Sequence, residues 1–410
     1  MRGFVAASLV CFLAGACASP PPWALGEARE AALDAVLTEA VASGCVPGVV
    51  ALVTTSDGVV YLRAVGVLDP TGAVPMRPDA IFDIASMTKP ITSLGVMMLI
   101  EEGELGLDEA ASRYLPELEG REVLVDVDPD AGTFRTRPAT RAVTIRDLLR
   151  HTSGIGYSFT SRELLALDRC SDLPDRLQPL LHDPGTRWTY GMGTAQLGWI
   201  LEQVSGQSLE EFLQARILGP LEMDDTSFYL PPEKAPRLAA VCRKMDGRWT
   251  APARPASVEG LERGDGDLFS TATDYAKFIQ LILGRGQRGG VRLLSEASVA
   301  EMTRDQLDGL TVVEQPVAMP SLSAPFPLGA GRDGFGLGFQ IAVDAPDGRP
   351  DGTLSWSGLF NTHFWIDPRN GIGVVLLFQV LPFYEPQVID VLRRVERAVY
   401  APVAADAPQR

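Results

Sequence analysis

Hydrophobic and polar positions repeat with two different periods in the first hundred residues. Apolar side chains recur along one stripe of residues 27–43, which predicts an amphipathic helix. Residues 46–67 contain two apolar, β-branched runs joined by Ser-Asp-Gly at 56–58, a pattern that indicates a β-hairpin. The apolar stretch at about 86–102 predicts a second helix, and Gly103 is suited to cap its C-terminus.

The middle of the chain, residues 106–262, has mostly helical patterning that is interrupted by turns rich in proline and glycine. The helical period is clearest at residues 143–154 and 193–221, and residues 274–286 predict a further helix. The sequence G-x-G-x-x-G at 284–289 follows this helix instead of a strand. We therefore interpret it as a loop and not as a dinucleotide-binding motif.

Strand patterns return near the C-terminus, at residues 334–380, and a last helix is predicted at 384–401. Strands at both ends with helices between them predict an α+β fold. In this fold a single antiparallel sheet, built from both termini and flanked by helices, receives a mostly helical region as an insertion. The expected parts are a discontinuous α/β domain (23–105 and 263–401), the helical region (106–262) and a tail (402–410).

The first 22 residues resemble an export signal and linker. Arg2 leads into an apolar run from Phe4 to Leu13 and then into small residues, the order found in secretory signals. This run is too short to span a bilayer, and no later segment is long enough, so we expect an exported protein, periplasmic or secreted, without a transmembrane segment. Ala-Gly-Ala-Cys ending at Cys17 also resembles a lipoprotein cleavage site, which leaves a lipid anchor open.

Composition and charge exclude several classes of partner. The chain of 410 residues is 46% hydrophobic and 21% charged, as in soluble globular proteins. Its formal net charge of −16 opposes binding to nucleic acid or to an anionic membrane surface. Cys45, Cys170 and Cys242 allow one disulfide at most, and whether Cys170 pairs with Cys242 is open. With three scattered histidines and no C-x-x-C, we expect no metal site and no cofactor.

One serine and one lysine are the first candidates for chemistry. The chain has only four lysines, and Lys89 stands three residues after Ser86 at the start of an apolar helix. Residues three apart share a helix face, so the amine and the hydroxyl are expected side by side. The helix N-terminus disfavours an ammonium, and burial would lower the pKa of Lys89 from about 10.4, so that it could act as a base. A chance S-x-x-K pair is the alternative.

Two further motifs extend this pattern. The sequences SMTK at 86–89, YGM at 190–192 and WSG at 356–358 resemble, in that order, the three motifs of the serine β-lactamase and penicillin-binding-protein superfamily. The surrounding sequence is similar to the class C β-lactamase-like branch, above all to family VIII carboxylesterases. The similarity extends from about residue 30 to residue 400 and so covers nearly all of the chain after the export signal.

This resemblance implies a fold and a set of catalytic roles. The fold would be that of β-lactamases and transpeptidases, in agreement with the α+β pattern. Ser86 would be the nucleophile, Lys89 would accept its proton, and Tyr190 would pass a proton to the leaving group. The backbone N–H groups of Ser86 and Leu359 would form the oxyanion hole.

Two departures from the lactamase motifs bear on the substrate. Met192 stands where those enzymes usually have asparagine, and Trp356 stands where a lysine or histidine usually engages the substrate carboxylate. We expect Met192 and the strand formed by Trp356, Ser357 and Gly358 to contact the substrate, and Tyr157 to wall the acyl pocket. An ester that lacks a carboxylate fits these changes better than a β-lactam does.

We therefore expect an exported serine hydrolase that cleaves small carboxylic esters through an acyl-enzyme. Two alternatives stay open: a β-lactamase or D-Ala-D-Ala peptidase that acts on amides, and a non-catalytic, penicillin-binding-like sensor or scaffold. His363 could line the site, although an ordinary strand position is the favoured interpretation. His151 and His182 are expected to be structural or surface groups. The physiological substrate and the oligomeric state are not fixed by the sequence.

Overall fold

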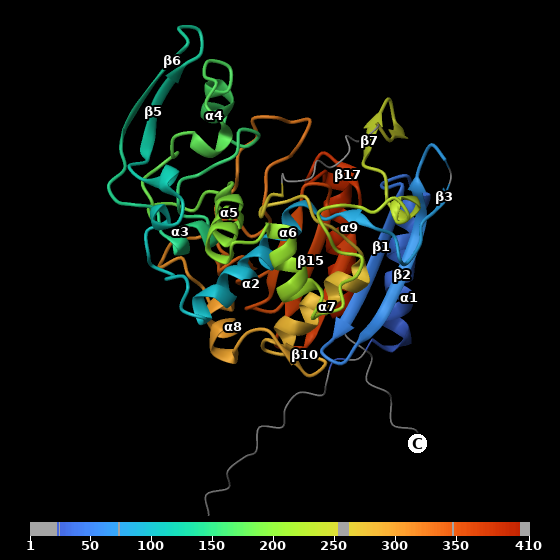
Figure 1. Ribbon diagram of the computed structural model, residues 1–410. Coiled ribbons are helices and arrows are strands. Elements are labelled where there is room, and N and C mark those ends of the chain that lie inside the picture. Colours follow the sequence, from blue (N-terminus) through green and yellow to red (C-terminus); the bar gives the residue numbers. More distant parts are fainter. Residues whose placement is uncertain (1–22, 24, 73, 253–261, 347, 402–410) are drawn as a thin grey trace, which may run out of the picture.

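The structure is a computed structural model that describes most of the chain (Figure 1). The predicted export signal, Cys17 and the predicted tail lie outside the described residues. The described residues are 23, 25–72, 74–252, 262–346 and 348–401.

Segments from both ends of the chain form one sheet. Its strands follow the order β12-β13-β14-β15-β16-β1-β2-β3, and neighbouring strands are antiparallel. The two ends of the chain meet where β1 pairs with β16, with Val50 opposite Leu377. The predicted α+β fold, with its sheet built from both termini, is confirmed. The strands are β1 (Gly48–Thr55), β2 (Val59–Asp69), β3 (Val74–Pro75), β12 (Gly334–Phe335), β13 (Gln340–Ile341), β14 (Leu354–Gly358), β15 (Thr362–Asp367) and β16 (Ile372–Leu377).

Helices cover both faces of this sheet (Figure 1). Strand β1 shows the two faces, because Val49, Ala51 and Val53 belong to a core with α1 and α9, whereas Val50 and Leu52 belong to a second core with α2 and α7. Alternate side chains of a strand point to opposite faces, so burial on both faces explains the continuous apolar run at residues 49–53 of β1. These helices are α1 (Gly26–Ala42), α2 (Thr88–Glu101), α7 (Ala272–Leu283) and α9 (Pro386–Tyr400).

The middle region contains helices, as expected, and also two hairpins that we did not predict. Hairpin β5–β6 is largely exposed, although valine recurs at every second position of β5. In hairpin β7–β8, strand β7 also pairs in parallel with β17. Further described helices are α3 (Ile145–Leu149), α4 (Arg162–Leu167), α5 (Gly193–Ser205), α6 (Leu209–Leu213) and α8 (Glu296–Thr303). Further strands are β4 (Phe82–Asp83), β5 (Glu122–Asp128), β6 (Thr133–Pro138), β7 (Cys242–Met245), β8 (Arg248–Thr250), β9 (Phe269–Ser270), β10 (Gln287–Arg288), β11 (Val291–Arg292) and β17 (Val380–Leu381).

The long helical pattern at 193–221 contains two α-helices, α5 and α6, with a break between them. α5 ends before Gly206, which has a left-handed φ of 69°. The Ser208 side chain then accepts a hydrogen bond from the backbone N–H of Glu211, and the Glu211 carboxylate accepts one from the N–H of Ser208. This capping box starts α6, so the break has a local cause.

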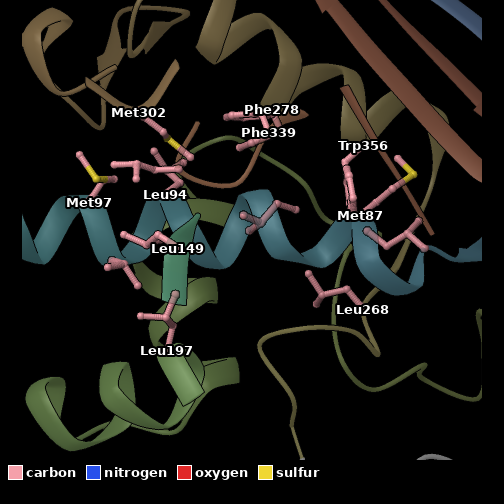
Figure 2. Packing of buried hydrophobic residues seen from close by; sticks show 14 of the residues in the cluster. Met87, Leu94, Met97, Leu149, Leu197, Leu268, Phe278, Met302, Phe339 and Trp356 are labelled. Atoms are coloured by element: carbon pink, nitrogen blue, oxygen red, sulfur yellow. The ribbon is translucent and has the colours of Figure 1, made fainter. Parts of the chain in front are cut away.

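Helix α2 crosses the interior between the sheet and the middle region. Nearly all of its side chains are buried, which explains why Lys89 and Glu101 are the only charged residues in this helix. Figure 2 shows Phe278, Phe339 and Met302 on one side of α2 and Leu197 of α5 on the other. A 3-10 turn, Ala85–Met87 (η1), precedes the helix, so Ser86 of the first motif lies just before α2.

Strand β14 lies directly against the segment that leads into η1. A Cβ atom on Gly358 would be 2.2 Å from the carbonyl oxygen of Ile84, so this approach requires glycine. Thr362 of β15 donates its hydroxyl to the same carbonyl oxygen at 3.2 Å. The Gln379 side-chain amide donates to the carbonyl oxygen of Asp83 at 2.8 Å and accepts from its N–H at 3.3 Å. The sheet therefore fixes the position of η1.

We expect Gly358→Ala to destabilise the protein by about 1–3 kcal/mol, because the added methyl group meets backbone atoms that cannot rotate away. Gly72→Ala is the control, since the nearest atom to a Cβ there would be a Val74 side-chain carbon at 3.6 Å, and its effect should stay within about 0.5 kcal/mol. Urea unfolding measures both changes. Equal unfolding midpoints for the two variants would contradict the close approach of β14.

Candidate active site

A cavity of about 250 Å³ brings the three motifs together. Ser86, Tyr190 and Trp356, one from each motif, all line it. Aromatic side chains form much of the remaining wall: Tyr157, Phe159, Phe326, Phe360 and Phe383. A cavity that combines aromatic walls with a limited set of polar and charged groups suits a small organic molecule.

A tight turn presents the Ser86 hydroxyl to this cavity. Ala85 has a φ of 43°, a left-handed value that costs about 1 kcal/mol or more for a residue with a side chain. The Asp83 carboxylate accepts a hydrogen bond from the N–H of Ala85 at 2.9 Å. Tyr275 Oη donates to the carbonyl oxygen of Met87 at 2.9 Å. These contacts hold Ser86 partly exposed, although both of its neighbours are buried.

Lys89 is almost wholly buried, with an exposed fraction of 1%. Its Nζ lies 3.0 Å from Ser86 Oγ, 3.0 Å from Tyr157 Oη and 2.6 Å from the carbonyl oxygen of Asp265. Burial lowers the pKa of Lys89 to about 7, although the Asp265 carboxylate favours the ammonium and opposes this shift. Near neutral pH, a large share of Lys89 is therefore a free amine at hydrogen-bond distance from Ser86.

Asp265 and Arg263 are parts of this site that the motifs did not indicate. Tyr157, which was expected only to wall the acyl pocket, donates its hydroxyl to Asp265 Oδ2. Arg263 Nε and Nη2 donate to the two carboxylate oxygens of Asp265, each at 3.1 Å. The sequence signal was the charged cluster RGDGD at 263–267, which is also an ordinary composition for a surface turn.

The Tyr190 phenol lies beside the same groups. Trp356 Nε1 donates to Tyr190 Oη at 3.3 Å, and Lys89 Nζ is 4.8 Å from the centre of the tyrosine ring. Burial raises the pKa of Tyr190, while hydrogen bonds with Ser86 and Trp356 partly oppose the shift. The phenol is therefore protonated near neutral pH and can donate a proton.

The glycine of the second motif, Gly191, allows the motif to pack closely against a neighbouring backbone segment. A Cβ atom on Gly191 would lie 1.9 Å from the carbonyl oxygen of Ile155, so the motif runs directly against that backbone. The N–H of Tyr190 donates to the Gln315 side chain at 3.1 Å. Met192 is buried in the core at the start of α5 and is not among the described residues that line the cavity, so its expected contact with the substrate is not seen.

The third motif contributes both a wall and a backbone segment. Ser357 and Leu359 line the cavity together with Trp356, whereas Gly358 faces the Ile84 carbonyl oxygen and is not among the lining residues. The approach of β14 to η1 brings Leu359 to the same cavity as Ser86. An oxyanion hole formed by these two N–H groups stays a prediction.

None of the three histidines is among the described residues that line the Ser86 cavity, although His151 packs against Tyr190. His151 is buried with its ring centre 4.9 Å from that of Tyr190, and burial lowers its pKa to about 3, so it is a neutral packing group. His182 Nε2 forms a hydrogen bond with the Thr189 hydroxyl at 2.9 Å. His363 lines a separate cavity of about 100 Å³ between the sheet and α9 and is not among the residues that line the Ser86 cavity.

Cys45, Cys170 and Cys242 are free thiols in the described part of the chain. Within the same residues, no cluster of three or more histidine, cysteine, aspartate or glutamate side chains is suited to hold a metal ion. None of the described helices combines the length and the apolar character that crossing a membrane requires.

Known proteins are similar to this chain in both sequence and fold. The family described as Beta-lactamase matches residues 33–398. A monacolin J acid methylbutanoyltransferase from Aspergillus terreus is 30% identical over 401 residues, which cover 90% of this chain and 95% of that protein. Esterase EstB from Burkholderia gladioli is 29% identical over 392 residues, which cover 87% of this chain and 92% of that protein.

The same fold occurs in solved structures. A mutant simvastatin synthase from Aspergillus terreus superposes with a TM-score of 0.80 at 29% sequence identity, over 92% of this chain and 98% of that chain. The family match spans most of the chain and includes Ser86, Lys89, Tyr190 and Trp356. The chain belongs to the beta-lactamase family.

Proposed function

We propose that the protein is a serine hydrolase that cleaves small carboxylic esters through an acyl-enzyme on Ser86. The observation that carries this proposal is the 3.0 Å contact between Ser86 Oγ and the buried Lys89 amine, whose pKa is about 7. With a pKa of about 7, a large share of this amine is unprotonated near neutral pH, and the unprotonated form can take the serine proton and so activate the oxygen as a nucleophile. The names of two relatives, an esterase and a methylbutanoyltransferase, support chemistry at esters.

Acylation would use the groups in the following way. Ser86 Oγ bonds to the ester carbonyl carbon while its proton passes to Lys89 Nζ. The N–H groups of Ser86 and Leu359 bind the negative oxygen that forms. As the bond to the alcohol oxygen breaks, Tyr190 gives that oxygen its phenolic proton, and the proton held by Lys89 replaces it. The alcohol leaves and the acyl group stays on Ser86.

Deacylation would reverse these roles with water in the place of the alcohol. Water attacks the acyl carbon and gives a proton to the pair formed by Tyr190 and Lys89. Ser86 Oγ then leaves with a proton from Lys89, and the carboxylic acid is released. The cycle consumes one ester and one water and restores every group of the enzyme.

The charges around the cavity favour a neutral ester over an anionic β-lactam. Trp356 has no charge to offer a substrate carboxylate. Arg263, the one arginine among the described lining residues, already binds both carboxylate oxygens of Asp265. Asp83 and Asp267 also line the cavity, so an anionic substrate meets more negative than positive groups.

Acyl transfer to an alcohol is a second candidate function, since the same acyl-enzyme could react with an alcohol instead of water. The aromatic walls, including Phe159, Phe326 and Phe383, favour it because they would bind an organic acceptor. The transferase among the relatives points the same way. The ratio of transfer product to free acid, measured as the alcohol concentration rises, separates the two functions.

Ser86→Ala should abolish turnover of a p-nitrophenyl ester of a short acid, with a loss of about 10³-fold or more in kcat. The wild-type protein should release a rapid burst of p-nitrophenol, and mass spectrometry should find the acyl group on the peptide that contains Ser86. Ser56→Ala, a control in the exposed hairpin turn, should keep wild-type rates.

Undiminished ester turnover by Ser86→Ala would refute this mechanism. Faster turnover of nitrocefin or of a D-Ala-terminated peptide than of the ester would support the alternative of amide chemistry. Labelling of Ser86 by a fluorophosphonate without turnover of any ester would support the sensor.

The pH dependence follows from the neutral form of Lys89. Because the base must be unprotonated, kcat/KM for the ester should be constant above the Lys89 pKa of about 7 and fall about tenfold per pH unit below it. Lys89→Arg should lose the activity at every pH, since a guanidinium stays charged. A profile that is flat between about pH 5.5 and 8.5 would exclude Lys89 as the base.

Tyr190→Phe tests the acid that protonates the alcohol. For alkyl esters, whose leaving alcohols need a proton, kcat/KM should fall by about 10²–10⁴-fold. For p-nitrophenyl esters the loss should be much smaller, because p-nitrophenolate leaves without a proton. Tyr275→Phe is the control: it removes the hydrogen bond to Met87 that holds the nucleophile turn, and should slow both ester types by the same factor. An equal loss for both ester types in Tyr190→Phe would contradict the acid role.

A further inference from the structure

Three oxygen atoms surround the Lys89 amine. The carbonyl oxygen of Asp265 is 2.6 Å from Nζ, and Tyr157 Oη and Ser86 Oγ are each 3.0 Å from it. A carbonyl oxygen can only accept a hydrogen bond. Tyr157 Oη can also only accept from Lys89, because its own proton is donated to Asp265 Oδ2. Two of the three neighbours of Nζ therefore require an N–H donor.

A neutral amine has two N–H groups and one lone pair. The two N–H groups of Lys89 match the two acceptors, and the lone pair is left for the proton of the Ser86 hydroxyl. We infer that Asp265 is a positioning residue for Lys89: its backbone carbonyl binds one N–H directly, and its carboxylate orients Tyr157 to bind the other. The inference rests on the proposed role of Lys89 as the base.

The Asp265 carboxylate is held firmly in this role. Its residue is 4% exposed, and the two bonds from Arg263 fix the plane of the carboxylate. Burial raises the pKa of Asp265, but Lys89 and Arg263 lower it and the net shift is downward. The group is therefore ionised at neutral pH and can only accept, so it keeps the Tyr157 proton turned toward itself.

The backbone around Asp265 is fixed as well. The carbonyl oxygen of the preceding residue, Gly264, accepts a hydrogen bond from Thr92 Oγ1 of α2 at 2.7 Å. A Cβ atom on Gly264 would lie 2.6 Å from the carbonyl oxygen of Thr194 in α5, so the loop is packed directly between the two helices. This packing sets the position from which the Asp265 carbonyl oxygen meets the amine of Lys89.

The same contacts give the two phenols different roles. Tyr157 has its proton committed to Asp265, so it has none to give to a leaving group. Tyr190 instead accepts a hydrogen bond from Trp356 Nε1, which leaves its own proton for the reacting atoms. Asp265 thus separates a phenol that orients the base from a phenol that serves as the acid.

Asp265 also influences the charge on Lys89. Asp265 and Asp267 favour the ammonium form and Arg263 disfavours it, with Asp265 the strongest of these charges. Asp265→Asn removes that charge and leaves Arg263 without its carboxylate partner, and both effects make Lys89 harder to protonate. The titratable groups that face Lys89 are His151, Tyr157, Tyr190, Arg263, Asp265 and Asp267.

The test compares profiles of kcat/KM against pH for the full-length protein and two variants. Asp265→Asn should lower the plateau by about 10–100-fold, since a displacement of about 1 Å in a catalytic group can cost about 10²-fold. In this variant, the fall of kcat/KM on the acidic side of the pH profile (the acidic limb) should move to lower pH. Tyr157→Phe, which removes the second acceptor, should lower the plateau by a similar factor. The double variant should lose little more than either single variant, because both break the same linkage.

Asp225→Asn is the matched control, because Asp225 also pairs with an arginine, Arg237, but lies outside the site. It should lower Tm and leave the plateau and the acidic limb unchanged. A merely structural role for Asp265 would give that same pattern in Asp265→Asn and would overturn the inference.

Two further outcomes would also overturn it: a wild-type plateau in folded Tyr157→Phe, or losses that multiply in the double variant. Tyr157→Phe decides the question if Asp265→Asn does not fold. A different measurement tests the proposed function itself: if Ser86→Ala still turns over the ester, the proposed function fails, whatever the result for Asp265.

Discussion

An ammonium group loses most of its hydration when it enters a protein interior, at a cost of several kcal/mol. Lys89 avoids much of this cost by giving up its proton, and its pKa falls to about 7. An amine stays neutral in this way only if it is enclosed on every side. Helix α2, the sheet and the middle region together supply that enclosure, so the assembly of the fold and the basicity of Lys89 depend on the same burial.

Three glycines mark where distant segments close around this amine. A Cβ atom would lie 1.9 Å from a backbone oxygen at Gly191, 2.6 Å at Gly264 and 2.2 Å at Gly358. Each of these glycines lies where one site segment contacts another: the tyrosine motif, the Asp265 loop and the third motif. None of the three has a positive φ, so each is needed for its missing side chain and not for its backbone freedom.

Contacts between residues close together in the sequence could be predicted more readily than contacts between residues far apart in the sequence. Ser86 and Lys89 are three residues apart, so helical geometry alone predicts that they meet, and the apolar runs at both ends predict the sheet. The break between α5 and α6 was equally local, at Gly206, and could have been predicted. The Asp265 contact spans 176 residues and uses a backbone oxygen, which has no signature in the side-chain pattern. Hairpin β5–β6 was missed although valine alternates with other residues at 123–127 of β5, a period-2 pattern from which this strand could have been predicted.

The uncharged tryptophan of the third motif has a consequence for Tyr190. A lysine in the place of Trp356 would bring a positive charge to the phenol and lower its pKa. Trp356 donates an N–H without a charge, so burial keeps Tyr190 protonated, and the proposed mechanism assigns the role of base to Lys89. A neutral ester would then experience no strong electrostatic attraction or repulsion in the cavity. The unprotonated form of Lys89 and the phenol of Tyr190 carry no charge, and Arg263 is already paired with Asp265. In the proposed mechanism, charge would develop only as Ser86 attacks, and the groups of the site would then stabilise the transition state more than the bound ester.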